Sequence, residues 1–286
     1  MTAAIHSTIV ALLGPDILAA LARIDGVPIA ADTITGLPAA RTDRATFRIV
    51  LEDGRVVKAR RMRRARKAER FTRIIRALAH DSLPAPLLVD GRVTIEAWID
   101  GAIVATLPLD HDRLVRAADL LASIHLAAGV RLRGRAPSDV VASTRRRLAN
   151  LSARGALARD EVDDALHLLQ RLAPSAADLG ITHNDFCAEN LVELPGGQLV
   201  VVDNEGLRQG FLDYDLARTW YRWSMSDAHW ATFVARYRSS RTDALPGDHE
   251  RFWRMAAVVK SAHLRAARCT ADAVAPIERL RALLAS

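Results

Sequence analysis

The chain has 286 residues, of which 50% are hydrophobic and 26% charged, a composition that excludes a disordered protein and allows one large or two modest domains. No apolar stretch reaches the roughly 18 residues of a membrane-spanning helix, so we expect no transmembrane segment. A secretory signal requires basic residues near its start, and no basic residue precedes Arg23. Because two cysteines make no disulfide framework, we expect a reduced, cytoplasmic protein. Of the net charge of +7, residues 1–100 hold +5 and 101–286 hold +2, which excludes a uniformly basic surface.

The first hundred residues combine strand patterns with two helices. An amphipathic helix is predicted over 5–24, interrupted or restarted at Gly14-Pro15, and apolar residues spaced i, i+3, i+4 and i+7 predict another around 71–78. Strands are predicted over 27–34, 46–53 and 55–61, with a further hairpin over 87–98. Asp53-Gly54 is a two-residue turn signal. These patterns predict a small antiparallel sheet with one inserted helix.

The basic residues gather in one part of this region. Residues 55–76 carry eleven Lys and Arg against one acid, Glu69. Two interpretations stay open: a solvated helix face, or a surface for phosphates, an anionic acceptor or a polyanion. Apart from Phe71, which belongs to the apolar helix face, no aromatic residue that stacks on bases alternates with these arginines. We therefore expect no nucleic-acid partner.

Residues 101–286 are mainly helical in pattern. Helices are predicted over 110–128, 138–152, 157–178, 213–224, 227–240, 247–269 and 274–284. The one clear strand signal here is a short hairpin over 191–203. The predicted fold class is α+β, with an N-terminal lobe of residues 1–100 built on the sheet and a helical C-terminal lobe of residues 101–286.

The segment HNDFCAEN, residues 183–190, carries the chemistry. Asp185 and Asn190, five residues apart on a loop, can present one oxygen to a substrate hydroxyl and another to a metal. Asp203, at the end of the next apolar strand, can hold the same metal from the other side. Phosphoryl transfer from a Mg-bound nucleoside triphosphate requires this arrangement, because its catalysis is mostly positioning and charge neutralisation. Glu205 follows by two residues, and a metal, substrate or structural role stays open for it.

The HxDxxxxN spacing, the downstream aspartate and the segment DYDLA at 213–217 resemble the aminoglycoside phosphotransferase and choline kinase group, small-molecule kinases with a protein-kinase-like, two-lobed fold. The order of elements is similar over 46–223, and the specific motifs lie within 181–220. The resemblance implies an enzyme, a phosphotransferase that moves the γ-phosphoryl group of ATP or GTP to a hydroxyl of a small molecule.

The resemblance also assigns roles in the catalytic segment. It implies that Asp185 is the base for the acceptor hydroxyl and that Asn190 and Asp203 hold Mg²⁺. It implies structural roles for His183, which would brace the loop backbone, and for Asp215, which would accept hydrogen bonds from backbone N–H groups of the catalytic loop.

Further roles in nucleotide binding come from the same resemblance. Lys58 lies on the second strand of the first hairpin, where the family has a lysine that reaches the α- and β-phosphates. Its implied partner is a glutamate of the following helix, and Glu69 is the only acid there. The stretch that includes Glu96, Ala97 and Trp98 is similar to the family's hinge, so backbone groups around Ala97 and Trp98 are expected to bind the edge of the base.

One loop departs from the family's pattern. Residues 35–44, which would cover the phosphates, contain a single glycine, Gly36, so a cradle of backbone amides is not expected. Arg41 or Arg44 either meets phosphate instead or is simply exposed. The atypical loop favours an alternative to an enzyme, namely a regulatory pseudokinase that binds a nucleotide without transferring phosphate. The presence of all the catalytic residues opposes this alternative.

The sequence leaves the acceptor open. A cationic acceptor, such as an aminoglycoside antibiotic or an amino alcohol, needs carboxylates, and the acids of residues 160–164 supply them unless that helix faces solvent. An amino acid, a sugar or an anionic lipopolysaccharide-type sugar fits the charges of the chain as well as a cationic acceptor does. Trp220, Trp223 and Trp230 share a helical face that either packs in the core or forms an aromatic wall beside the acceptor.

Overall fold

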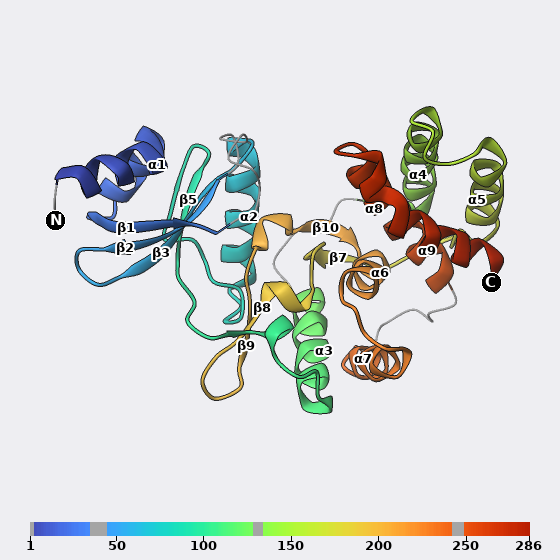
Figure 1. Cartoon of the computed structure of the whole chain (residues 1–286). Coiled ribbons are helices and arrows are strands. Elements are labelled where there is room, and N and C mark those ends of the chain that lie inside the picture. The colour runs from blue at the N-terminus through green and yellow to red at the C-terminus, as the bar shows by residue number, and fades with distance from the viewer. Residues whose placement is uncertain (1–2, 35–44, 128–133, 242–248) are drawn as a thin grey trace. The chain divides into compact units, whose positions relative to one another are not determined.

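The computed structural model describes residues 3–34, 45–127, 134–241 and 249–286 (Figure 1). The described residues within Met1–Pro108 and Glu189–Arg208 form one compact unit, and those within Leu109–Ala127, Arg131–Ala188 and Gln209–Ser286 form a second. The predicted phosphate-covering loop at 35–44, with Gly36, Arg41 and Arg44, lies outside the described residues. None of the described helices is both long and apolar enough to cross a membrane.

The first unit is built on an antiparallel sheet. In the part of the chain that the structure describes, this sheet has five strands in the order β1-β2-β3-β5-β4. Their bounds are β1 Pro28–Thr33, β2 Thr46–Leu51, β3 Val56–Arg61, β4 Leu88–Asp90 and β5 Val93–Ala97. The β2–β3 turn uses Gly54 with a φ of 84°, a conformation that glycine adopts without strain. The two predicted hairpins are therefore present.

Helix α1, Ala3–Ala22, packs on one face of this sheet (Figure 1). Gly14 interrupts the helix with a φ of 74°, directly before Pro15, whose missing N–H cannot continue the hydrogen-bond ladder. The buried side chains of α1 form a core with those of the sheet, among them Leu13, Ile17, Phe47, Ile49, Val57 and Ala59. Because side chains alternate along a strand, Lys58 and Arg60 project from the other face of β3.

Helix α2, Ala65–Leu78, has the apolar face that the sequence predicted, with Phe71, Ile74 and Ile75 buried. The segment 189–208 packs with the same unit, although the prediction assigns it to the C-terminal lobe. In the described structure it contributes two strands to a three-stranded sheet of β6 Ala102–Ile103, β8 Leu191–Glu193 and β9 Leu199–Val201. The lobe boundary at residue 100 stays a prediction.

The second unit is mainly helical. Its helices are α3 His111–Leu126, α4 Pro137–Ala153, α5 Arg159–Arg171, α6 Leu212–Arg222, α7 Asp227–Ser239, α8 Glu250–Ala266 and α9 Val274–Ala285. Helix α5 ends earlier than the predicted 157–178, since Pro174 cannot continue a helix. The four-residue strands β7 Leu179–Thr182 and β10 Arg208–Phe211 pair with each other. These two strands were missed, because four residues are too few for a clear alternation.

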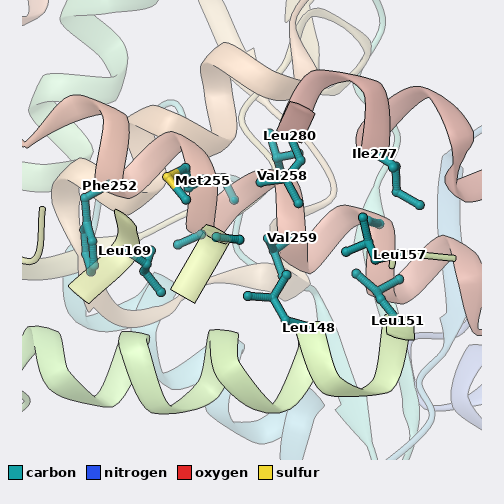
Figure 2. Close-up of a cluster of buried hydrophobic side chains, with 14 of the residues drawn as sticks. Leu148, Leu151, Leu157, Leu169, Phe252, Met255, Val258, Val259, Ile277 and Leu280 are labelled. Atoms are coloured by element: carbon teal, nitrogen blue, oxygen red, sulfur yellow. The ribbon is translucent and has the colours of Figure 1, made fainter. Parts of the chain in front are cut away.

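Helix α8 is the centre of the second core. Figure 2 shows its Phe252, Met255, Val258 and Val259 among leucines from α4, α5 and α9. A helix that is buried on several sides needs apolar residues at nearly every position, and residues 255–259 have this pattern.

The three tryptophans with helical spacing do not share one environment. Trp223 and Trp230 are buried, and both contact Phe233. The centroid of the Phe233 ring lies 6.0 Å from that of Trp223 and 5.7 Å from that of Trp230. Trp220 is only partly buried, and the guanidinium carbon of Arg254 lies 4.3 Å from its ring centroid. Core packing, one of the two interpretations, therefore describes Trp223 and Trp230.

Candidate active site

Lys58 of the first unit is buried between two acids. Strand pairing sets it directly opposite Glu96 of β5, and its Nζ lies 3.7 Å from Glu96 Oε2. The same Nζ donates a hydrogen bond to Asp203 Oδ1 at 2.8 Å. An ammonium group is costly to bury without a partner, and these two carboxylates offset that cost.

The expected pairing of Lys58 with Glu69 is wrong. Glu69 lies on the exposed side of α2, whose buried face is formed by Phe71, Ile74 and Ile75. Among the residues that the structure describes, the side chain of Glu69 takes part in no hydrogen bond or ion pair. The register of β3 and β5 instead makes Glu96 the acid beside Lys58.

Asp203 lies two residues after β9, with a φ of 63° that is uncommon outside glycine. Its Oδ1 accepts hydrogen bonds from both Lys58 and Arg60. Burial alone would raise the pKa of Asp203, but the positive charges of Arg60 and Lys58 outweigh burial and hold its pKa well below the usual range. Asp203 is therefore an anion at neutral pH, as a metal ligand must be.

Arg60 is the residue of this unit that sequence reasoning missed. It is buried and pairs with Glu205 as well as with Asp203. Burial alone would lower the pKa of Arg60, but the negative charges of Glu205, Asp203 and Glu96 outweigh it and raise the pKa. The signal was available in the sequence, because Arg60 follows Lys58 by two residues on a strand and so shares its face.

Lys67 of α2 completes this arrangement, with its Nζ 3.7 Å from Glu205 Oε1. The resulting cation–carboxylate cluster consists of Lys58, Arg60, Lys67, Glu96, Asp203 and Glu205. Its three cations and three acids balance in charge.

A cavity of about 290 Å³ in the first unit opens on this cluster. Its polar side chains include Lys58, Arg60, Glu96, Asn190 and Asp203. Its apolar side chains include Ile34, Trp98, Ile103, Val192 and Val201. A largely apolar pocket with a few convergent charged groups at one side is typical of a small-molecule site.

Asn190 is buried in this cavity wall, and its backbone carbonyl accepts a hydrogen bond from the Val202 N–H at 2.9 Å. In the described part of the chain no group of three or more His, Cys, Asp and Glu side chains is placed to hold a metal by itself. Mg²⁺ commonly takes one or two protein oxygens together with substrate phosphates and water. The amide oxygen of Asn190 and the carboxylate of Asp203 fit that ligand set.

The predicted hinge residues Ala97 and Trp98 also line the cavity. However, the Trp98 N–H donates to the Val56 carbonyl at 3.0 Å, so the strand ladder already uses this donor. The guanidinium carbon of Arg48 lies 5.3 Å from the Trp98 ring centroid. Binding of the base by other backbone groups around Ala97 and Trp98 stays a prediction.

Asp185 belongs to the second unit, and its side chain is 41% exposed. Its Oδ1 lies 2.9 Å from Arg222 Nε and 3.4 Å from Arg218 Nη2. Both arginines come from α6, where residues four apart share a face. Arg218 Nε also donates to the Asn184 carbonyl at 3.2 Å. Neither arginine was among the predicted site residues, although both lie on the helix of Asp215, which the resemblance already set against the loop.

The loop that carries Asp185 is hydrogen-bonded to Asp215, whose side chain is fully buried. Asp215 accepts hydrogen bonds from the His183 N–H at 2.7 Å and the Asn184 N–H at 2.6 Å. These are the backbone hydrogen bonds that the resemblance implied for Asp215. They fix Asn184 with a φ of 69°, a conformation that persists only where surrounding contacts hold it.

Asp215 is linked in turn to His125 and Tyr237. Its Oδ2 lies 3.1 Å from His125 Nε2, and His125 Nδ1 lies 2.6 Å from the Tyr237 hydroxyl. Burial alone would raise the pKa of Asp215, but hydrogen bonding and charge from His125 outweigh it and lower the pKa. Burial lowers the pKa of His125. Sequence reasoning missed this link, because His125 lies 90 residues before Asp215.

His183 is fully buried, and its ring meets Phe186 edge to face with centroids 6.2 Å apart. With its backbone N–H bound to Asp215, it makes the contacts that a bracing residue makes. A structural role for His183 stays the interpretation.

Comparisons with known proteins show a family and several similar folds. The model of the phosphotransferase enzyme family matches residues 33–255. Choline kinase LicA from Streptococcus pneumoniae superposes with a TM-score of 0.69 and 16% identity, over 94% of this chain and 97% of LicA. The same kinase in complex with AMP gives 0.64 and 15%, over 94% and 96%. No curated protein sequence matches.

A third solved structure is the macrolide 2'-phosphotransferase MphH from Brachybacterium faecium, with a TM-score of 0.64 and 17% identity over 94% of this chain and 96% of MphH. Such low identities establish the fold alone. The predicted α+β, protein-kinase-like fold class is therefore confirmed. The family match confirms the resemblance that was drawn from the catalytic segment.

Proposed function

The chain belongs to the phosphotransferase enzyme family, and on this premise we propose that it transfers the γ-phosphoryl group of ATP or GTP to a hydroxyl of a small molecule. The observation that carries the proposal is the cavity of the first unit, where Lys58, Asn190 and Asp203 line one wall. The catalytic segment continues five residues upstream to Asp185, on a loop held by Asp215.

The apolar part of the cavity would hold the base, and the cations would hold the phosphates. Trp98, Val192 and Val201 offer apolar surface, while Lys58 and Arg60 offer positive charge. Since residues 35–44 contain a single glycine, side-chain cations are a substitute for a cradle of backbone amides. In this proposal Arg60 binds phosphate oxygens beside Lys58. The AMP-bound LicA structure, which shares the fold, supports a nucleotide co-substrate.

Asn190 and Asp203 would hold Mg²⁺. When bound, this ion supplies charge neutralisation to the phosphate oxygens. Glu96 and Glu205 keep Lys58 and Arg60 in position through their ion pairs, so the cations stay directed at the phosphates.

Asp185 would act as the base. The acceptor hydroxyl donates its proton to the Asp185 carboxylate while the hydroxyl oxygen forms a bond to the γ-phosphorus, and the bond to the nucleoside diphosphate breaks. The hydrogen bonds that Asp215 accepts hold the loop, and the contacts from Arg218 and Arg222 hold the carboxylate. The acceptor hydroxyl then meets a base whose position is already set.

The test compares the full chain with its Asp185→Ala variant, using ATP and GTP with Mg²⁺ and a panel of antibiotics, sugars and amino alcohols. We expect nucleoside diphosphate release to fall roughly 10²- to 10⁴-fold in the variant, with nucleotide affinity nearly unchanged. Asp164→Asn, an exposed acid on α5, is the matched control and should leave both quantities unchanged.

Two results would count against the proposal. A wild-type protein that binds no nucleotide contradicts the phosphotransferase function. A protein that binds Mg–nucleotide but transfers to no acceptor of the panel favours the pseudokinase alternative.

A further inference from the structure

Helix α2 of the first unit carries arginines that the proposed function leaves unused. Arg66, Arg70, Arg73 and Arg76 are exposed, whereas Lys67 belongs to the cation–carboxylate cluster. At about 100° per residue, these four arginines lie within an arc of roughly 120° around the helix axis. At a rise of about 1.5 Å per residue, they extend over roughly 15 Å of its length. They therefore share one side of α2.

Three more exposed arginines adjoin the N-terminal end of this helix. Arg63 and Arg64 directly precede Ala65, the first residue of α2. Arg92 follows β4 in the turn to β5, and its backbone carbonyl accepts a hydrogen bond from the Met62 N–H at 2.7 Å. Together the exposed residues form what we call the arginine face, which consists of Arg63, Arg64, Arg66, Arg70, Arg73, Arg76 and Arg92.

The charge of the arginine face is not neutralised within the part of the chain that the structure describes. There, none of its side chains takes part in a hydrogen bond or an ion pair. Glu69 is the single acid among residues 63–76, and Asp90, two residues before Arg92, pairs with Arg23 at 3.0 Å. The cation–carboxylate cluster of the same unit, in contrast, matches three cations with three acids.

This surplus of charge works against the helix that carries it. Like charges three or four residues apart repel each other on a helix, as Arg66 does Arg70 and Arg70 does Arg73. The first turn of α2 contains no acid, and Arg64 and Arg66 place cations at the positive end of the helix dipole. A helix face that is merely solvated typically alternates the two signs of charge. Of the two interpretations of the basic segment, a surface for an anionic partner is therefore favoured.

The other side chains of α2 discriminate between anionic partners. Along this helix, which the structure describes in full, the one hydroxyl and the one aromatic side chain, Thr72 and Phe71, are both buried. The exposed side thus offers no ring to stack on nucleic-acid bases and no hydroxyl or amide to read their edges. It also offers no large apolar side chain of the kind that anchors a protein–protein interface. Exposed ion pairs by themselves contribute little to binding of another protein.

We propose that the arginine face docks the protein on an anionic membrane surface by binding the phosphates of lipid headgroups. A group of about four to eight Lys or Arg residues on an amphipathic helix is typical of binding to anionic lipids. A lipid surface presents anions throughout its plane, so all the arginines contribute without a fixed register. This inference goes beyond the proposed phosphotransferase function and does not depend on it.

The apolar side of α2 sets the mode of docking. A helix that lies in a membrane interface inserts its apolar face between the lipids. In α2 that face, formed by Phe71, Ile74 and Ile75, is buried in the protein. Binding therefore depends on charge alone, and salt should abolish it.

The test measures co-sedimentation of the full chain with vesicles of phosphatidylglycerol and phosphatidylcholine in equal amounts, and with vesicles of phosphatidylcholine alone. We expect binding to the anionic vesicles only. That binding should be lost as the salt concentration rises from about 0.1 M to about 1 M, because the Debye length falls from about 10 Å to about 3 Å. A DNA duplex of mixed sequence, at the same phosphate concentration, is the competing polyanion and should bind more weakly than the anionic vesicles.

A triple variant with Arg66→Gln, Arg70→Gln and Arg73→Gln identifies the surface. Each arginine near an anionic surface contributes roughly fivefold to the affinity, so the triple variant should bind the anionic vesicles roughly 100-fold more weakly. The corresponding Arg→Lys variant should bind nearly as the wild type does, because the attraction depends on charge. Since the Gln substitutions remove repulsion, urea denaturation should show no loss of stability. If the triple variant does not fold, the variant with Arg66→Gln and Arg73→Gln serves, with an expected loss of roughly 25-fold.

The matched control removes the same amount of charge from the second unit. It combines Arg145→Gln and Arg146→Gln of α4 with Arg159→Gln of α5, three exposed arginines that lie outside the arginine face. This control should bind the anionic vesicles as the wild type does, which separates an effect of the surface from an effect of the net charge.

Several results would overturn the proposal. The anionic vesicles bind no protein, which favours a merely solvated helix face, or they bind it no better than phosphatidylcholine does. The Gln variant binds as the wild type does, or the control variant loses as much affinity as the Gln variant. Binding withstands the rise in salt. The DNA duplex binds more tightly than the vesicles, which makes nucleic acid the partner.

Discussion

The two units of the molecule hold their candidate functional carboxylates in different ways. In the first unit Asp203 is fixed by ion pairs with Lys58 and Arg60, inside a cluster whose cations and acids balance. In the second unit the loop of Asp185 is fixed by hydrogen bonds to buried Asp215. In the proposed function the first arrangement exchanges partners when phosphates and a metal bind, whereas the second is set before any substrate binds.

We expect the largest effect from a substitution that breaks the hydrogen bonds between Asp215 and the loop of Asp185. Asp215→Asn removes a buried charge that accepts hydrogen bonds from His183, Asn184 and His125. Because it leaves buried donors without an acceptor, we expect the free energy of unfolding to fall by about 3–5 kcal/mol. Urea denaturation measures this. The exposed-acid variant Asp164→Asn should change it by less than about 0.5 kcal/mol, and an equally small change in Asp215→Asn would contradict the role given to Asp215.

The next effect tests partner exchange in the first unit. Asp203→Asn removes one acid from the balanced cluster, which leaves Lys58 and Arg60 more attractive to phosphates but removes the proposed metal ligand. We expect ATP without Mg²⁺ to bind more tightly and Mg–ATP to bind roughly tenfold more weakly. Fluorescence titrations with and without Mg²⁺ measure both affinities. Asp81→Asn, an exposed acid, is the control, and parallel changes in the two affinities would rule the exchange out.

A smaller effect separates the roles of the two strand cations. Arg60→Gln should weaken binding of ATP several-fold and leave binding of adenosine unchanged, since Arg60 is proposed to meet phosphates alone. Binding that is several-fold weaker corresponds to about 1 kcal/mol. Arg76→Gln, on the exposed side of α2, should bind both as the wild type does. Equal losses for ATP and adenosine would show that Arg60 supports the cavity and not the phosphates.

A further effect, which depends on pH, compares two acids on α6 whose pKa values shift in opposite directions. The pKa of Asp215 is lowered, whereas burial and the negative charge of Asp178 raise the pKa of Asp213 to about 6. The folded protein therefore binds the Asp213 proton more tightly than the unfolded chain does. The stability that Asp213 contributes is present below its unfolded pKa and is lost as the pH rises through about 6.

Asp213→Asn removes this penalty. We expect its free energy of unfolding to exceed that of the wild type by about 1–2 kcal/mol at pH 7, relative to the difference between the two proteins at pH 4. Urea denaturation at the two pH values measures it. A difference that does not change with pH would show that Asp213 keeps its ordinary pKa in the folded protein.

Sequence patterns alone predicted most of the helices and strands and indicated candidate reacting side chains. The period of the apolar residues predicted the β2–β3 hairpin and α2, because a strand and a helix each impose their own spacing on a buried face. The spacing of Asp185, Asn190 and Asp203 identified the phosphotransferase chemistry, since these residues lie close together along the chain.

Most of the ion-pair partners, in contrast, depend on tertiary packing. Sheet register placed Glu96 opposite Lys58, where local spacing had suggested Glu69. Helix packing brought His125 to Asp215, and Arg218 and Arg222 to the loop of Asp185. An ion pair depends on distance in space, and no local pattern encodes which distant segment will lie within reach of a given charge.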